Sequence, residues 1–353
     1  MTTSVRAPGE QPDAAVAALS LAARPRRGTG LLVALASGAA FGTSGTFGDG
    51  LLRAGWSPGA AVLARITVAA LVLTPVALPR LRDQRTALRQ NVRQVLVYGL
   101  VGVLGCTFCY FDAIATIPVG VGLLLEYTAA IMVVAWLWLR HGQRPRWLTI
   151  TGTAAAIGGL ALMAGITGSG GLNLTGFAWG MAAAVCMTVF MFVCDSPAPP
   201  APDGLAAADE LATSGEPAPG NPAPAGLSPT ELSPVVLSWA GICVAAVALA
   251  ILGAAHVIPL AASTSDVILL SDRVSWILPV LAVGILSTAV AYIAAVAAVR
   301  SLGAKLATFI GMSEILFAAA FAWLMLGQVP TPVQLAGSGL IVAGVLLIRV
   351  DER

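Results

Sequence analysis

Long apolar runs alternate with short polar segments along almost the whole chain. Each run extends for about 20 residues, the length of an α-helix that crosses the ~30 Å hydrocarbon core of a bilayer. Arg, Pro and Gly residues gather between the runs and mark where each one ends. We therefore expect an all-α integral membrane protein with ten transmembrane helices, near residues 30–52, 58–78, 93–116, 118–139, 147–166, 172–194, 233–257, 276–299, 303–326 and 332–350.

The composition supports a membrane protein and argues against other classes. Of the 353 residues, 58% are hydrophobic and only 10% are charged, and the mean hydropathy is +0.88. Soluble domains contain about a quarter charged residues. The formal net charge of +2 leaves no basic surface large enough for nucleic acid, so we expect no nucleic-acid partner.

Two polar segments stand apart from the predicted helices. Residues 1–28 contain charges and prolines around a short Ala-rich stretch, which is typical of a disordered cytoplasmic tail and not of a signal peptide. Residues 195–232 are acidic, rich in Pro, Ala and Gly, and without periodicity. Such a segment buries too little apolar surface to offset the entropy of ordering it. We expect a disordered cytoplasmic linker between the sixth and seventh helices.

The arginines predict the orientation of the chain in the membrane. With the N-terminus inside, the cytoplasmic segments hold almost all of them, and the outer segments keep only Arg53 and Arg273. An excess of Arg in short cytoplasmic loops sets topology in this way. We therefore expect a multi-pass protein of the cell membrane with both termini in the cytoplasm.

The second half of the chain repeats the first at an offset of 185 residues. Trp138-Leu139-x-x-Gly142-Gln143-x-Pro145 aligns with Trp323-Leu324-x-x-Gly327-Gln328-x-Pro330. Gly152 and Gly159 then align with Gly337 and Gly344. Five helices per copy would invert the second copy, giving repeats 29–167 and 172–350, the latter containing the linker. Inverted repeats are typical of secondary transporters, whose substrate site lies near the bilayer midplane.

Three motifs carry a resemblance to a known family. Phe41-Gly-Thr-Ser-Gly45, Leu123-Leu-Leu-Glu-Tyr-Thr-Ala129 and the stretch from Ser313 to Gln328 resemble the EamA family of the drug/metabolite transporter superfamily. The resemblance covers residues 30–350. It implies two inverted five-helix repeats and export of amino acids, other metabolites or drugs. The long acidic linker departs from the family pattern, as do Gln143 and Gln328, where the family often has Glu.

Four ionisable residues fall inside predicted helices: Arg65, Asp112, Glu126 and Glu314. A charge near the bilayer centre costs about 2.5–3.5 kcal/mol on insertion scales, so intramembrane charges are usually functional. We hypothesise that Glu126 and Glu314 line a central cavity and take up a proton or a substrate amino group. Tyr127 lies beside Glu126, in apolar surroundings that favour proton exchange near neutral pH.

Arg65 and Asp112 have two interpretations. Arg65 would hold a substrate carboxylate or pair with Asp112 or Glu126. Alternatively, Arg65 and Asp112 form a static buried ion pair that only fixes helix packing. Asp49 and Arg53, one helical turn apart, are expected to form a surface pair.

The first helix carries Gly38, Gly42, Thr43, Ser44 and further glycines near its middle. Small residues at helical spacing usually mean close helix packing. The functional alternative is a locally loosened helix that offers Thr43, Ser44 and backbone groups to a substrate.

Other functional classes are disfavoured. A serine protease needs a histidine base near Ser44, but His141 and His256 lie at helix ends. Metal-ligand motifs are also missing from the sequence, so we expect no enzyme activity, metal or cofactor. The sequence therefore predicts a carrier that exports a small metabolite such as an amino acid, with proton coupling as a further hypothesis. Efflux of lipophilic cations, a passive channel and a non-transporting receptor are the alternatives.

Overall fold

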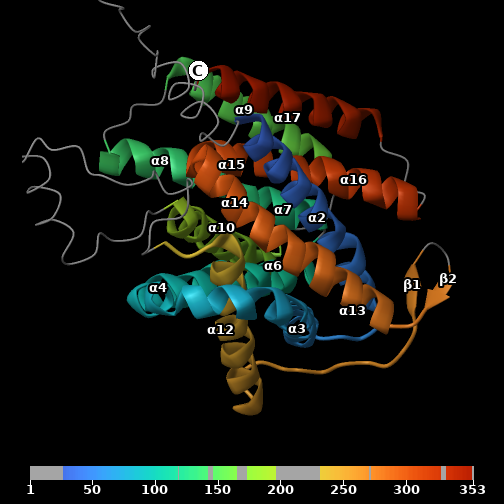
Figure 1. The fold of residues 1–353 in the computed structure, drawn as a ribbon. Helices are drawn as coiled ribbons and strands as arrows, with labels where there is room; N and C mark the ends of the chain where they lie inside the picture. The colour runs from blue at the N-terminus through green and yellow to red at the C-terminus, as the bar shows by residue number, and fades with distance from the viewer. Residues whose placement is uncertain are drawn as a thin grey trace, which may run out of the picture.

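The computed structural model describes residues 27–117, 119–141, 146–164, 173–195, 231–269, 272–326 and 331–351. Residues 1–26 of the expected tail and 196–230 of the expected linker lie outside this part, as do Gln143 and Gln328. Within it, helices joined by short connections dominate, and a two-stranded hairpin is the one sheet (Figure 1). The expected all-α membrane architecture is observed, with this small hairpin as an addition.

The described residues of the first half form nine elements. They are α2 (Arg27–Arg53), α3 (Pro58–Asp83), α4 (Arg85–Gln90), α5 (Val92–Val97), the π-helical segment η1 (Tyr98–Gly105), α6 (Cys106–Ile114), α7 (Val119–Tyr127), α8 (Ala129–His141) and α9 (Trp147–Ala164).

The second half contains the hairpin and the remaining helices. They are α10 (Leu174–Asp195), α12 (Pro234–Ala254), β1 (Val267–Leu269), β2 (Asp272–Val274), α13 (Ile277–Gly284), the π-helical segment η2 (Ile285–Val290), α14 (Ala291–Leu302), α15 (Ala304–Gly311), α16 (Ser313–Leu326) and α17 (Pro332–Asp351). The strands are antiparallel, with Val267 opposite Val274.

Eight helices of the described chain are long and apolar enough to cross a membrane. They are Thr29–Arg53, Pro58–Asp83, Val92–Ile114, Val119–Arg140, Leu174–Asp195, Pro234–Ala254, Ile277–Leu302 and Ala304–Phe321. Two shorter apolar helices, Trp147–Leu162 and Leu335–Ile348, lie where the fifth and tenth spans are expected. Large apolar side chains such as Leu71, Ile251 and Leu335 are more than half exposed, as expected for surfaces that face lipid.

Four of the spans are not regular α-helices. The span Val92–Ile114 contains η1 and the span Ile277–Leu302 contains η2, and the two segments overlap at the 185-residue offset. The other two irregular spans, Val119–Arg140 and the one that begins at Ala304, bend between α7 and α8 and between α15 and α16. There the amide of Ile131 bonds to the carbonyl of Thr128, and the amide of Ile315 bonds to the carbonyl of Met312, one residue closer than in an α-helix. Irregular segments of this kind frequently occur at functional sites.

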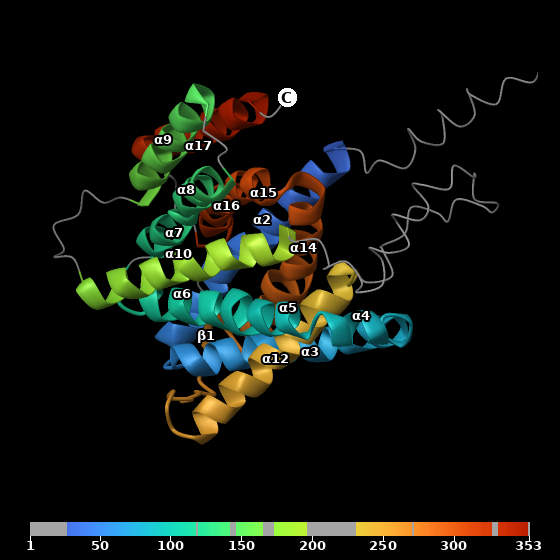
Figure 2. The same ribbon diagram turned by 90° about the vertical axis from the view of Figure 1, so that its left-hand side faces the viewer.

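Two outer helix pairs enclose a central group of helices. In both views α9 lies along α17 on one side, and α3 and α12 lie together on the other (Figures 1 and 2). Between them, α2 packs against α14 and α16, while α10 packs against α6 and α7. The centre of the protein is therefore built from elements of both halves.

The outer pair α9 and α17 crosses through glycines. A Cβ atom added to Gly159 would lie 2.4 Å from the carbonyl oxygen of Gly337, and one added to Gly344 would lie 2.5 Å from that of Gly152. The earlier glycine of α9, Gly152, meets the later glycine of α17, Gly344, and the later one, Gly159, meets the earlier one, Gly337. The two helices are therefore antiparallel. Only glycine permits this backbone approach.

Glycines also set the position of α2. A Cβ atom on Gly38 would lie 2.8 Å from Ser313 Oγ, and one on Gly42 would lie 2.9 Å from the carbonyl oxygen of Glu314. The close-packing interpretation of the small residues in the first helix is therefore confirmed. α2 is continuous from Arg27 to Arg53, so the first helix is not locally loosened, and a contact of Thr43 or Ser44 with substrate stays a hypothesis.

The other outer pair is joined by two matching helix starts. Ser57-Pro58 begins α3 and Ser233-Pro234 begins α12, each with the serine as N-cap and the proline in the first turn. Ser57 Oγ also donates to the carbonyl oxygen of Pro259, which follows α12. Ser233 bonds to the side chain of Gln84, which follows α3. Each helix start is thus fixed to the segment after the other helix.

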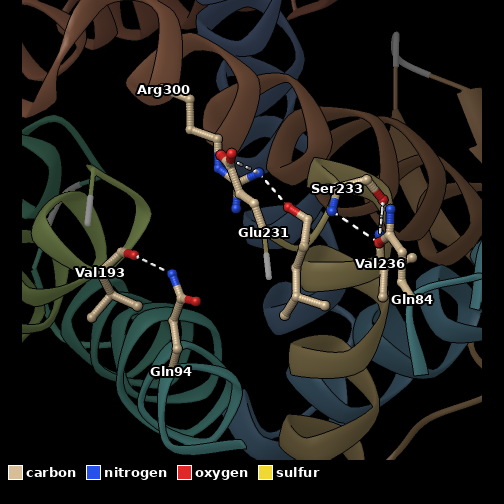
Figure 3. Close-up of polar contacts among 8 residues, drawn as sticks. Gln84, Gln94, Val193, Glu231, Ser233, Val236 and Arg300 are labelled. Atoms are coloured by element: carbon tan, nitrogen blue, oxygen red, sulfur yellow. Dashed lines mark hydrogen bonds and ion pairs between the residues drawn. The ribbon is translucent and has the colours of Figure 1, made fainter. Parts of the chain in front are cut away.

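Figure 3 shows the end of the protein at which Ser233 lies. Arg300, at the end of α14, donates to the carbonyl oxygen of Leu232 and lies 3.7 Å from Glu231. Gln94 of α5 donates to the carbonyl oxygen of Val193 in α10 at 2.9 Å. These contacts connect the ends of four helices.

Candidate functional site

A cavity lies among the central helices, with about 70 Å³ open to the centre of a water-sized molecule. Its lining comes from α2, α3, η1, α6, α7, α10, α14, α15 and α16, so both halves of the chain contribute. On α2 it extends from Ala34 to Ser44, which is about 15 Å along the helix axis. Five of the predicted site residues line it: Ser44, Arg65, Glu126, Tyr127 and Glu314.

Arg65 lies at the end of the cavity near η2 and is only 3% exposed. Its Nε donates to Thr288 Oγ1 at 2.8 Å, and its two terminal nitrogens donate to Ser44 Oγ at 3.0 Å and the carbonyl oxygen of Ser287 at 2.8 Å. The guanidinium also lies over the ring of Phe111, 5.4 Å from its centre. These contacts hold a buried cation with neutral groups, leaving its charge uncompensated by direct pairing.

Asp112 lies outside this arrangement. It is half-buried on α6, it does not line the cavity, and it forms no ion pair with Arg65. The predicted static pair between these residues is therefore not formed. Helix depth alone suggested it, but their positions around the helix axes separate the two side chains. The surface pair of Asp49 and Arg53 is confirmed, with 2.7 Å between Oδ2 and Nε.

Glu126 faces the cavity from the last turn of α7. The thiol of Cys106 donates to its Oε1 at 3.1 Å. A thiol is a weak donor, so this contact leaves most of the hydrogen-bonding capacity of the carboxyl group available. Glu126 also has no ion-pair partner within 4 Å among the described residues. It is positioned to bind a ligand that brings its own donors.

Tyr127 and Glu314 meet at the bend between α15 and α16. The Tyr127 hydroxyl oxygen lies 2.7 Å from Glu314 Oε2 and 2.7 Å from the carbonyl oxygen of Gly311. Tyr127 is 1% exposed, so its ring is fixed by packing. The pair joins a half-helix of the first half of the chain to a half-helix of the second.

The two hydroxyl residues of the first helix have different surroundings. Ser44 lines the cavity and accepts from Arg65, as described above. Thr43 does not line it, and its hydroxyl lies 2.7 Å from Ser287 Oγ and 2.7 Å from the carbonyl oxygen of Ala40. Thr43 therefore connects α2 to η2, and a substrate would meet Ser44 only.

Aromatic side chains form much of the remaining wall. Tyr292 is central among them, since its ring centre lies 5.2 Å from that of Phe41 and 5.7 Å from that of Phe190. Thr107 bonds to the Tyr292 hydroxyl at 3.0 Å. Sequence reasoning did not select these residues, nor Ser287 and Thr288, because an aromatic or hydroxyl residue inside an apolar run looks like ordinary helix packing. The one available signal was that Ser287 and Thr288 are adjacent hydroxyl residues within the apolar run Ile277–Leu302.

The described residues contain no group of three or more His, Cys, Asp or Glu side chains that could hold a metal ion. The five cysteines are free. The polar and aromatic groups of the cavity are thus one guanidinium, two carboxyl groups, a thiol, hydroxyls and aromatic rings.

Comparisons with known proteins agree with this architecture. The sequence model of the EamA-like transporter family matches residues 28–165 and 226–350. A solved structure described as "Crystal structure of protein" has a TM-score of 0.64 and 18% sequence identity, and the alignment covers 91% of this chain and 98% of that chain. At this identity the likeness shows the fold alone. No curated protein matches the chain significantly.

Proposed function

The chain belongs to the EamA-like transporter family, and from this premise we propose that it exports a small amino-acid-like metabolite by alternating access. The family is one of membrane transporters and is generally non-enzymatic, so a small-molecule substrate and a membrane environment follow from membership. The class of substrate, the coupling to protons and the direction of transport are our proposals.

The observation that carries the proposal is one cavity with opposite charges. Arg65 provides a buried cation, and Glu126 and Glu314 provide carboxyl groups on the facing elements. A zwitterion satisfies both kinds of group, because its carboxylate accepts from Arg65 and its amino group donates to Glu126. The aromatic wall around Tyr292 then packs against the substrate side chain.

Repeated contacts support an inverted repeat and hence alternating access. Gly344 is the counterpart of Gly159, and Gly337 is the counterpart of Gly152 at the 185-residue offset. The observed contacts join Gly159 with Gly337 and Gly152 with Gly344. A two-fold axis that exchanges α9 and α17 produces this reciprocal pattern. Rocking of one repeat against the other would expose the cavity to each side in turn.

The matching starts of α3 and α12 support the same relation. Ser57 is fixed to the segment after α12, and Ser233 to the segment after α3. We further propose that both termini lie in the cytoplasm and that the protein resides in the cell membrane. The arginine distribution supports this orientation.

The second candidate is efflux of lipophilic cations. The carboxyl groups and the aromatic rings of Phe41, Phe190 and Tyr292 favour it, since aromatic faces attract organic cations. Arg65 opposes it, because a fixed guanidinium in the same cavity repels a ligand of the same charge.

Counterflow in proteoliposomes tests the proposal. Vesicles loaded with unlabelled amino acids should accumulate the matching labelled compound with saturation, whereas vesicles loaded with lipophilic cations should not. Glu126→Gln should lower the apparent affinity for the amino acid at least tenfold. Asp112→Asn, which alters a carboxyl group outside the cavity, is the matched control and should leave affinity unchanged. Counterflow of cations alone would favour efflux, and binding without any counterflow would indicate a receptor.

A further inference from the structure

The Tyr127 hydroxyl contacts two acceptor atoms but carries one hydrogen. Its oxygen lies 2.7 Å from the carbonyl oxygen of Gly311 and 2.7 Å from Glu314 Oε2. Both distances are those of strong O–H···O hydrogen bonds. A tyrosine hydroxyl supplies one donor. One of the two contacts therefore needs a hydrogen that Tyr127 does not provide.

The Gly311 carbonyl has the stronger requirement for the Tyr127 hydrogen. In a regular helix the amide of Ile315 would donate to this carbonyl. At the bend between α15 and α16 that amide donates to the carbonyl of Met312 instead, at 3.2 Å. The Gly311 carbonyl is a permanent acceptor, and buried carbonyls are nearly always paired. If the Tyr127 hydroxyl donates its one hydrogen to Gly311, the hydrogen between Tyr127 and Glu314 must come from the Glu314 carboxyl group.

The surrounding charges favour the same arrangement. The charged and titratable groups acting on Glu314 are Glu126 and Tyr127 from α7 and Arg65 from α3. On the facing side of α2, Gly38 and Gly42 present no ionisable group. Two ionised carboxylates with one guanidinium would give the cavity a net charge of −1 in a low-dielectric region. One neutral carboxyl group removes this excess.

We propose that Glu314 is the proton-binding residue of this transporter and is neutral in the conformation described. Its carboxyl O–H donates to Tyr127, and the Tyr127 hydroxyl donates to Gly311. Glu126 stays ionised and balances Arg65. The inference rests on the proposed function for its role in transport, but the protonation state follows from the geometry alone. Glu314 and Glu126, which the sequence did not distinguish, thus have different roles: Glu314 binds the proton and Glu126 carries the negative charge.

The arrangement links the proton to the bend between α15 and α16. When Glu314 gives its proton to water in the cavity, the Tyr127 hydroxyl turns to the new carboxylate, which is the stronger acceptor. The Gly311 carbonyl then loses its donor at the bend that packs against Gly38 and Gly42 of α2. Loss of the proton therefore destabilises this bend and favours another conformation of α16 relative to α2.

Infrared difference spectroscopy of the purified protein tests the protonation state without any transport. We expect the carbonyl stretch of a buried, protonated carboxylic acid at neutral pH in the wild type and in Asp112→Asn, which leaves both carboxyl groups of the cavity in place. Glu314→Gln should lose this band and still fold, because the glutamine amide replaces the neutral acid as a donor to Tyr127. A band that disappears in Glu126→Gln and persists in Glu314→Gln would overturn the proposal, as would its absence from the wild type.

Tyr127→Phe provides a second measurement should Glu314→Gln fail to fold. Removing the hydroxyl takes away the acceptor of the carboxyl hydrogen, so the band should move to higher wavenumber. An unchanged band would show that the carboxyl group does not bond to Tyr127. Counterflow measured on the same preparations separates the two proposals. If the band is present and counterflow is absent, the proton site is supported and the transport function is refuted. If counterflow is present and the band is absent, the transport function is supported and the proton site is refuted.

Discussion

Two adjacent glycines of α9 should respond in opposite ways to the same substitution. A Cβ atom on Gly159 would lie 2.4 Å from the carbonyl oxygen of Gly337 and 2.9 Å from the Cβ atom of Leu340. A Cβ atom on Gly158, one residue earlier, would meet no atom within 4 Å. Both positions are helical. Alanine therefore changes helix propensity equally at the two sites but creates a steric overlap at only one.

The magnitudes follow from these two effects. Replacing glycine by alanine inside a helix stabilises it by about 0.5–1 kcal/mol, so Gly158→Ala should gain that amount. Inserting a methyl group into a closely packed contact costs about 1–3 kcal/mol. Because backbone atoms of α17 are the ones approached, they relax little, and Gly159→Ala should lose about 1–2 kcal/mol net. Gly344→Ala, 2.5 Å from the carbonyl oxygen of Gly152, should lose a similar amount.

Equilibrium unfolding in mixed micelles, followed by circular dichroism, measures these differences. The wild type and the three variants should be compared at the same detergent composition. If Gly158→Ala and Gly159→Ala shift the unfolding free energy by the same amount, the glycine crossing of α9 and α17 is wrong. If Gly344→Ala is neutral while Gly159→Ala is destabilising, the contacts are not reciprocal and the two-fold relation loses its support.

Two further perturbations test the polar contacts. Arg65→Lys keeps the charge but retains about one of three buried hydrogen bonds, and two such bonds at about 1.5 kcal/mol each predict a loss of about 3 kcal/mol. Arg53→Lys at the exposed pair should change stability by less than about 0.5 kcal/mol in the same unfolding assay, and equal effects would contradict the burial argument. Arg300→Gln removes the bond to the carbonyl oxygen of Leu232 and should cost about 1–2 kcal/mol, whereas an unchanged unfolding curve would show that this contact does not stabilise the helix ends.

The helices and their order could be predicted because apolar runs of fixed length are a direct consequence of the bilayer thickness. The charged candidates could be predicted for a related reason, since an ionisable residue inside such a run is costly. The residues that contact these charged side chains could not be predicted. Arg65 was expected near Asp112 from depth, but depth along a helix does not specify the direction of a side chain around it. The structure directs Arg65 to Ser44, Ser287 and Thr288 instead.

The bends at Thr128 and Met312 and the π-helical segments were also outside the reach of sequence reasoning. They depend on packing between distant helices, such as the approach of Gly42 to the backbone of α16, and leave no pattern in a local apolar run. By itself the sequence determined that the chain spans a membrane, which residues carry charge inside it, and which glycines permit close helix contacts. Only the tertiary structure decided that Glu126, Glu314 and Arg65 share one cavity and that Asp112 does not, because that choice depends on the rotation of each helix about its own axis.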